Sequence, residues 1–487
     1  MDKWILDKIL EITSLIKYNG EKRDFIEKAL KKFLINPRKD FSVEKEIEKI
    51  FHRKDILKKD TGIKDLKNIF SLNTIFEMQD YILTVDVGLT DLFFYLIEKY
   101  KEYDLKLKDE IGITIFEIIK FCSLLQNIYY YDLITGNYEF NRNIFSSKEE
   151  AYYAYKLKSP DKKSKQTSER ASFISKDAFV YFLENGIKDK KIQSIIDNVD
   201  KFFNLLSFTI DDIRRDEKIR FQDKPLLQVN EDSYILINEV HLIFGLPYRL
   251  DSLLNKYSWY TNNKGKAFEK VVYKVLNEIN QNKRIRGKFF PDIRYGRSKN
   301  YQLDGLINFE DFSWFIECKG RIPRSDSFKG KVKSVNQDIK KGVTNAEDQA
   351  IRAIRASETN QKIGNKSVKE KKGILIIVEG MYPNLNQNPI TQFKRRDEKY
   401  PRYIISFFTL MEILRQYDVY YLEKFLEWRS DLDMPIYCMS ELDYWDYFTQ
   451  MQNGLDKKEA YDTAKKRNIR VIFNGKRFNV PKFIKEN

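Results

Sequence analysis

A short apolar segment that carries two charged residues limits what this chain can fold into. The segment runs from Ser313 to Gly320 and reads Ser-Trp-Phe-Ile-Glu-Cys-Lys-Gly. Side chains alternate between the two faces of a strand, so Phe315, Glu317 and Lys319 are expected to share one face. Burying an acid and a lysine on so apolar a strand is costly unless other groups compensate their charges. A divalent metal ion and an oxyanion substrate would provide that compensation.

A second carboxylate comes from the segment just before this strand, Gln302–Ile307, which reads Gln-Leu-Asp-Gly-Leu-Ile and is expected to form a hairpin with it. Two carboxylates suit a hard cation such as Mg²⁺, which takes oxygen ligands, keeps several waters and binds substrate phosphates. Asp292, in a Pro-Asp pair, is the alternative source of the second carboxylate. Asp304 is preferred because Leu-Asp-Gly lies on a clear strand edge immediately before the charged strand.

Two further segments complete a recognisable pattern. Asn263–Lys270 reads as an amphipathic helix that carries an acidic residue, and Ala346–Arg352 reads as a helix that carries a glutamine. With these segments the chain resembles the PD-(D/E)xK superfamily of nucleases, in the variant seen in nuclease-related and Mrr-like restriction domains. The resemblance covers about Asn263 to Phe407 and implies a restriction-endonuclease-like α/β/α sandwich.

The resemblance also implies a role for each site residue. Asp304, Glu317 and the main-chain carbonyl of Cys318 would hold Mg²⁺, for which Mn²⁺ is expected to substitute. Lys319 would orient or help deprotonate the attacking water and offset charge on the phosphate. Glu269 would contribute indirectly, through a metal-bound water.

Positive charge gathers directly after the charged strand. The chain has a formal net charge of +15, and the segment Arg321–Lys372 holds fourteen Lys or Arg against six Asp or Glu. A basic segment beside a metal motif favours contact with the phosphates of DNA. Gln349 is expected to position water or phosphate. The residues expected to contact DNA are Lys331, Lys333, Lys340, Lys341 and Arg352.

Composition excludes several other classes of protein. The most apolar helical stretch, Ile111–Leu125, is short and contains Glu117 and Lys120, so no membrane span is expected. The first residues do not read as a signal peptide, and a cytoplasmic location is therefore expected. The three cysteines are far apart and odd in number, which argues against a disulfide framework and a zinc site. The two histidines have apolar neighbours and are expected to be structural.

The 487 residues are enough for several domains. The expected fold class is α/β (α+β), with a helical N-terminal domain followed by the sandwich and its mixed central sheet. The expected domains are a helical domain for targeting, assembly or regulation at 1–155, a basic linker or loop at 156–176, a connecting helical and β-hairpin region at 177–260 that packs onto the nuclease core, the nuclease domain at 261–420, and an aromatic-rich cap at 421–487.

Hydrophobic periodicity predicts the individual elements. In the sandwich the expected strands are Phe289–Tyr295, Tyr301–Ile307, Ser313–Lys319, a fully buried Gly373–Glu379 and Tyr403–Phe407, with helices at Ala346–Ser357 and from Leu410 to Tyr417. Elsewhere, helices are expected at Asp24–Ile35, Lys108–Tyr131 and Glu239–Lys256, a hairpin at Leu226–Ile237 and a terminal strand at Ile469–Phe473.

These features favour a Mg²⁺-dependent DNA endonuclease, and a bacterial restriction or antiphage role fits the layout by analogy alone. One rival is a catalytically silent nucleic-acid-binding or scaffold protein with a nuclease fold, which the intact Asp304, Glu317 and Lys319 argue against. Another is a nuclease subunit that acts only with a partner ATPase, because the chain has no motor motif. A homodimer and a partner defence subunit both stay open.

Overall fold

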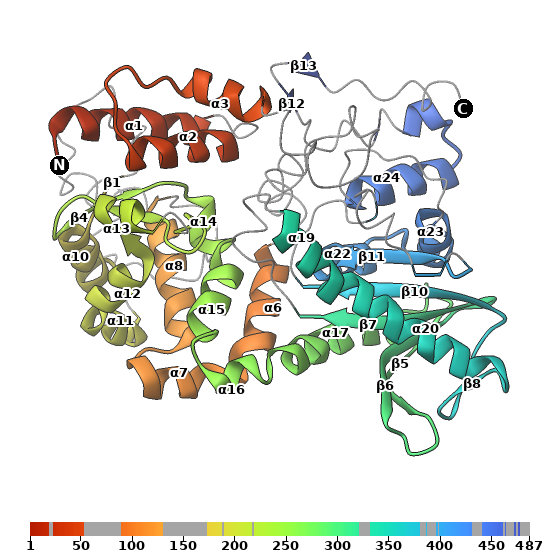
Figure 1. The fold of residues 1–487 in the computed structure, drawn as a ribbon. Helices are drawn as coiled ribbons and strands as arrows, with labels where there is room; N and C mark the ends of the chain where they lie inside the picture. Colours follow the sequence, from red (N-terminus) through yellow and green to blue (C-terminus); the bar gives the residue numbers. More distant parts are fainter. Residues whose placement is uncertain are drawn as a thin grey trace. The chain divides into compact units, whose positions relative to one another are not determined.

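The computed structural model divides into two compact units (Figure 1). The described residues are 1–18, 23–52, 89–129, 173–187, 189–216, 219–320, 332–379, 386, 396–397, 399–430, 441–460, 463, 472–473 and 476–477. Unit 1 comprises Met1–Arg53 and Tyr100–Tyr260, and unit 2 comprises Lys54–Lys99 and Thr261–Asn487. The boundary at residue 261 coincides with the expected start of the nuclease domain. Residues 156–172 of the expected linker lie outside the described residues, as does Lys331.

Unit 1 combines helices with a small four-stranded sheet. Its elements are α1 (Lys3–Tyr18), α2 (Arg23–Ile35), α3 (Val43–His52), η3 (Lys101–Tyr103), α7 (Asp104–Ile111), α8 (Ile115–Tyr129), β1 (Phe173–Ser175), α10 (Lys176–Gly186), η5 (Lys190–Ile192), α11 (Gln193–Asp197), α12 (Val199–Leu206), β2 (Ser207–Phe208), α13 (Ile210–Arg215), β3 (Leu226–Gln228), β4 (Ser233–Leu236), α14 (Val240–Ile243) and α15 (Leu246–Leu254), and α16 (Ser258–Thr261) ends beyond the boundary. The strand order is β1-β4-β3-β2, with β2 parallel to β3 and the other pairs antiparallel.

The region 177–260 shares its core with the N-terminal helices. One cluster joins buried side chains of α1 and α2 with Phe208, Leu227 and Ile235 from three strands of the sheet. The region was expected to pack onto the nuclease core, and in unit 1 the side chains of its sheet in this cluster are covered by the first helices of the chain. Strand β1, which pairs with β4, also falls inside the stretch expected to be a linker.

Two helices expected to be continuous are broken at glycines. Gly112, with φ of +74°, ends α7, so the expected helix Lys108–Tyr131 becomes α7 and α8. The expected helix Glu239–Lys256 splits into α14 and α15 at Gly245. A Cβ at Gly245 would collide with the main-chain carbonyl oxygen of His241, so only glycine allows this close approach.

Unit 2 is built on a mixed five-stranded sheet in the order β11-β10-β7-β6-β5. Its elements are α6 (Leu89–Tyr100, the last residue belonging to unit 1), α17 (Lys264–Gln281), β5 (Lys288–Tyr295), β6 (Tyr301–Asn308), β7 (Phe312–Lys319), α19 (Val332–Ile339), η6 (Lys340–Thr344), α20 (Asn345–Glu358), β8 (Lys362–Ile363), β9 (Lys366–Ser367), β10 (Lys371–Val378), β11 (Arg402–Ser406), α22 (Phe407–Arg415), η7 (Val419–Tyr421), α23 (Leu422–Arg429), α24 (Glu441–Gln452), β12 (Ile472–Phe473) and β13 (Lys476–Arg477).

The sheet has an antiparallel half and a parallel half. Strands β5, β6 and β7 run antiparallel to one another, and β7, β10 and β11 run parallel. Helix α20 packs on one face, and α17 packs on the other beside α22, where the rings of Phe268 and Phe407 lie 5.8 Å apart. The expected α+β class, with helices on both faces of a mixed sheet, is confirmed.

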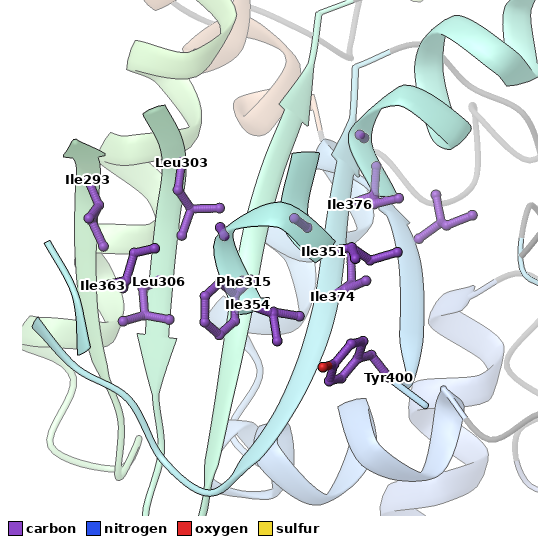
Figure 2. Close-up of a cluster of buried hydrophobic side chains, with 14 of the residues drawn as sticks. Ile293, Leu303, Leu306, Phe315, Ile351, Ile354, Ile363, Ile374, Ile376 and Tyr400 are labelled. Atoms are coloured by element: carbon purple, nitrogen blue, oxygen red, sulfur yellow. The ribbon is translucent and has the colours of Figure 1, made fainter. Parts of the chain in front are cut away.

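The alternation of side chains shifts in the middle of the β5–β6 hairpin (Figure 2). Leu303 and Leu306 both belong to the core cluster beneath α20, although an odd separation would place them on opposite faces of a regular strand. Phe290 packs against the same cluster, and Ile293 belongs to it, so β5 shifts at the same level. The shift in β5 includes Asp292, whose φ of +45° lies in the left-handed region.

Helix α6 packs in unit 2, although the sequence places it in the expected N-terminal domain. The ring of Tyr95 packs edge-on against Phe408 with centroids 4.9 Å apart. The Tyr95 hydroxyl donates to the carboxylate of Glu379, and the buried ammonium of Lys99 pairs with the same carboxylate. Asp91, one turn earlier on α6, forms an ion pair with Arg415 of α22. Apolar and ionic contacts therefore both attach α6 to the sheet unit.

Helix α22 begins at Phe407, earlier than the expected Leu410. Ser406 caps it, because its Oγ accepts the main-chain N–H of Thr409 at 3.1 Å. Of the expected strand Ile469–Phe473, the described part is β12, which pairs with β13. Among the helices that the structure describes, none has the length and apolar character needed to cross a membrane.

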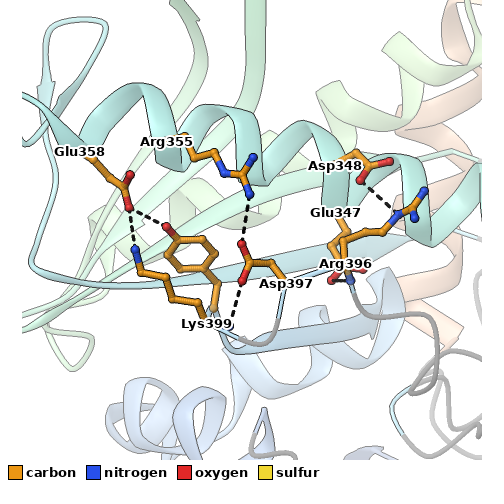
Figure 3. A network of polar contacts seen from close by, with 8 residues as sticks. Glu347, Asp348, Arg355, Glu358, Arg396, Asp397 and Lys399 are labelled. Atoms are coloured by element: carbon orange, nitrogen blue, oxygen red, sulfur yellow. Dashed lines mark hydrogen bonds and ion pairs between the residues drawn. The ribbon is translucent and has the colours of Figure 1, made fainter.

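A polar network ties α20 to the segment before β11 (Figure 3). Glu347 is fully buried and forms an ion pair with Arg402 at 2.7 Å, and it also accepts the main-chain N–H of Arg396 at 2.9 Å. The next residue on the helix, Asp348, forms an ion pair with the Arg396 side chain at 3.3 Å, and both partners are about half exposed. One helical turn thus presents a buried pair beside an exposed pair.

Glu347→Ala should lower the free energy of unfolding by about 3–5 kcal/mol, because it removes the carboxylate that balances a buried guanidinium. Asp348→Ala is the matched control, and it should cost less than about 1 kcal/mol because water screens its pair. Urea unfolding followed by circular dichroism measures both variants. Equal decreases in the free energy of unfolding of the two variants would show that the burial of the Glu347 ion pair contributes nothing to stability.

Candidate active site

Glu317 and Lys319 lie on the face of β7 that α20 covers, as the alternation predicted. The Lys319 Nζ donates to Glu317 Oε2 at 3.0 Å and to Gln349 Oε1 on α20 at 2.7 Å. Glu317 is 1% exposed, and Lys319 is partly buried at the end of the strand. The structure thus brings three of the expected site residues into one hydrogen-bonded group.

The Asp304 carboxylate reaches the same group by accepting a main-chain N–H of β7 at a position where two paired strands normally exchange main-chain hydrogen bonds. The residue-by-residue pairing of β6 with β7 ends at Gly305 and Ile316. Beyond that point the Cys318 N–H donates to the Asp304 carboxylate at 2.7 Å instead of to a main-chain carbonyl. Asp304 is 8% exposed, and its carboxylate is thereby fixed next to Glu317.

Asp292 has a different environment. Its side chain is about half exposed, and one carboxylate oxygen lies 4.0 Å from the Arg294 Nε. The carboxylate still acts electrostatically on Asp304, whose pKa it helps to raise. A metal ligand is expected to be held in place by its surroundings, and the buried, hydrogen-bonded Asp304 meets that requirement better.

The carboxyl groups of the site are hard to ionise together. Burial, followed by the charge of Asp304, raises the pKa of Glu317 to about 8 against the opposing charge of Lys319. Burial also raises the pKa of Asp304, although its bond from the Cys318 N–H acts in the opposite direction. Desolvation and mutual repulsion both favour the protonated forms, so a cation at this place would be strongly stabilising.

Glu269 joins the site from the opposite side of the sheet. It lies on α17, and burial together with the charge of Asp304 raises its pKa to about 7, while Lys319 lowers it. Tyr273, one turn further along α17, has a buried hydroxyl without a hydrogen-bond partner among the described residues. Burial and the charge of Asp304 raise the pKa of that hydroxyl. Glu269 therefore lies within electrostatic range of Asp304, and its expected role through a metal-bound water stays a prediction.

The donor set fits a hard cation that keeps part of its water shell. Glu317 Oε1 is buried and has no hydrogen-bond partner among the described residues, so one ligand oxygen is available. Within the described parts of the chain, no three His, Cys, Asp or Glu side chains gather closely enough to hold a metal ion by themselves. Asp304, Glu317 and the Cys318 carbonyl, completed by water, match the preference of Mg²⁺ for few protein ligands.

The structure describes four of the residues that were expected to contact DNA, all except Lys331. Lys333 on α19, Lys340 and Lys341 on η6, and Arg352 on α20 are all exposed, as phosphate contacts must be.

The buried Glu379 was not among the expected site residues. It follows the apolar strand β10 directly, and a charged residue at the end of such a strand was the available signal.

Glu379 supports the end of the charged strand. Its main-chain N–H donates to the Lys319 carbonyl at 3.1 Å. A Cβ at Gly320 would lie 2.9 Å from the Phe268 Cβ and 3.2 Å from Glu379 Oε2. Glycine is therefore needed at position 320 for the strand to leave the sheet between these two side chains.

Comparisons with known proteins found no matching family model, no matching curated protein and no matching solved structure. The geometry of the site itself therefore carries the functional argument.

The raised pKa of Glu317 predicts how the stability of the metal-free protein depends on pH. The folded carboxyl keeps its proton up to about pH 8, whereas the unfolded one loses it near pH 4.5. The unfolded state binds fewer protons in this window, so stability falls as pH rises through it. Glu317→Gln keeps the shape without the charge. It should raise the free energy of unfolding by a few kcal/mol at about pH 8.5, since one pKa unit corresponds to about 1.36 kcal/mol.

Urea unfolding with a chelator at about pH 5 and about pH 8.5 measures the effect, which should be much smaller at the lower pH. Glu370→Gln, at an exposed position, is the control and should change little at either pH. A Glu317→Gln variant that is no more stable than the natural protein at the higher pH would contradict the raised pKa.

Proposed function

We propose that this chain is a Mg²⁺-dependent endodeoxyribonuclease of the PD-(D/E)xK type that hydrolyses phosphodiester bonds. The observation that carries the proposal is the group formed by Lys319, Glu317 and Gln349 beside the buried Asp304. Two buried carboxylates and a lysine, brought together from the neighbouring strands β6 and β7, are expensive to assemble, and they match the needs of phosphodiester hydrolysis. By analogy of layout, the role would be in bacterial restriction or antiphage defence, in the cytoplasm.

The residues of the site divide the work between them. Asp304, Glu317 and the Cys318 carbonyl would hold Mg²⁺, which supplies Lewis acidity and lowers the pKa of a bound water. Lys319 uses two of its three N–H donors on Glu317 and Gln349 among the described residues. The third donor can orient the attacking water or stabilise the charge that develops on the phosphate. Gln349 is a positioning residue, because it fixes the ammonium that acts.

Positive charge around the site supports DNA as the substrate. Lys333, Lys340, Lys341 and Arg352 are exposed on the helices that follow β7. They can neutralise phosphates and release condensed counterions without reading base sequence.

Lys319→Ala should reduce cleavage of supercoiled plasmid by at least about a hundredfold, because a charged group that acts on the transition state is lost. Folding and DNA binding should change little. Lys372→Ala is the matched control, because Glu370-Lys371-Lys372 repeats the acid-x-lysine pattern at a surface site whose ammonium contacts the Glu370 carbonyl. Gel assays with and without Mg²⁺ measure nicking and linearisation. Natural protein that leaves circular DNA intact, or a fully active Lys319→Ala variant, would refute the proposal.

Metal binding gives a readout that is independent of cleavage. Mg²⁺ or Mn²⁺ should raise the melting temperature of the natural protein, because a ligand that binds the folded state stabilises it. Asp304→Asn and Glu317→Gln should lose this rise, whereas Asp292→Asn should keep it because Asp292 is half exposed. Differential scanning fluorimetry measures the shift. Loss of the rise in Asp292→Asn alone would identify Asp292 as the ligand instead.

A further inference from the structure

Tyr301 is an exposed aromatic residue at the end of the sheet where the charged strand β7 terminates. It is 51% exposed at the start of β6. Strands β5 and β7 run in the same direction, because each is antiparallel to β6. The tip of the β5–β6 hairpin, residues 296–300, therefore lies at the same end of the sheet as Lys319. Tyr301 begins the strand that carries Asp304, so its ring lies toward the same end of the sheet as the carboxylates.

The Tyr301 ring is held in place by its neighbours. It stacks on Tyr295, its partner in the strand register, with centroids 5.6 Å apart and an angle of 29° between the rings. Tyr295 is buried in the cluster beneath α20, so it is a rigid base for the exposed ring. The Arg352 guanidinium lies 5.7 Å from the Tyr301 centroid. Arg352 follows Gln349 by one turn of α20, so the same helix contacts both Lys319 and Tyr301.

The surroundings of this ring are positively charged. Arg294, Arg297 and Lys299 are exposed on the hairpin, and the sequence from Ile293 to Leu303 contains no acidic residue. The acidic neighbour just before this range is Asp292, 4.0 Å from the Arg294 Nε. A flat aromatic surface among cations is suited to a nucleotide, whose base can stack while its phosphate meets the cations. A paired base within a duplex hides both of its flat faces, so stacking on Tyr301 requires an unpaired base.

We infer that Tyr301 and Arg352 bind an unpaired DNA nucleotide next to the scissile phosphate, Tyr301 by stacking on the base and Arg352 by contacting the phosphate. This inference rests on the proposed nuclease function and specifies its substrate class. The preferred substrate is single-stranded DNA, or DNA with unpaired bases beside the cut.

The test measures DNA binding without cleavage. Full-length Lys319→Ala protein is titrated, at one fixed salt concentration, with a fluorescein-labelled single-stranded oligothymidylate and with a duplex of equal length. Fluorescence anisotropy should show tighter binding of the single strand. Adding Tyr301→Ala should weaken single-strand binding by about tenfold, as expected for loss of one stacked base, and should leave duplex binding nearly unchanged. Tyr301→Phe keeps the ring and should restore the affinity.

Tyr417→Ala is the matched control. Tyr417 is 73% exposed, and the Arg284 guanidinium lies 4.8 Å from its ring centroid. Tyr417 follows α22, which starts where β11 ends and leads back along the sheet. Arg284 precedes β5. The pair therefore lies at the opposite end of the strands from Tyr301. The control should bind both probes as the Lys319→Ala parent does.

Equal weakening by Tyr301→Ala and Tyr417→Ala, equal weakening of single-strand and duplex binding, or no weakening at all would overturn the inference. The two proposals fail in different ways. Natural protein that binds single strands through Tyr301 but never cleaves them would refute the nuclease alone. Metal-dependent cleavage that is indifferent to Tyr301→Ala would refute the nucleotide site alone.

Discussion

The burial of strand β7 is the constraint on which the rest of unit 2 depends. Every residue from Phe312 to Cys318 is buried, and one of them is a carboxylic acid. Burying that acid without compensation would cost several kcal/mol, so neighbouring elements must bring charges and donors to the end of the strand. Helix α20 brings Gln349 to Lys319, and β6 brings Asp304 to the Cys318 N–H. The parallel strand β10 continues into Glu379, which binds the main chain of Lys319.

The sequence was sufficient to predict the strands of this sheet and the faces of β7. Period-two alternation is regular in β7, so Glu317 and Lys319 could be assigned to one face. The uninterrupted apolar run Gly373–Glu379 predicted a second strand, β10, buried on both sides. The shift of alternation near Asp292 and Asp304 could not be predicted in this way. The shift arises where the Asp304 carboxylate accepts the N–H that a main-chain carbonyl of the neighbouring strand would otherwise accept. The sequence pattern of one β-strand does not contain that information.

The packing of the helices was harder to predict than their positions. An amphipathic helix shows that it has an apolar face without showing which element covers it. For that reason α6 was grouped with the N-terminal helices, whereas Tyr95 and Lys99 attach it to unit 2. For the same reason the connecting region 177–260 was expected to pack onto the nuclease core, whereas side chains of its small sheet share a core with α1 and α2. Glycine breaks at Gly112 and Gly245 were also missed, because their effect depends on local geometry.

The attachment of α6 has a consequence for how the protein is made. Lys99 and Glu379 are separated by 280 residues, so a ribosome produces the lysine long before its partner. Strands β10 and β11, which close the parallel half of the sheet, are also synthesised late. A nascent chain therefore carries the charged strand for some time without the elements that hold its end in place. If the protein cuts DNA, this order of synthesis delays that activity until β10 and β11 have been made.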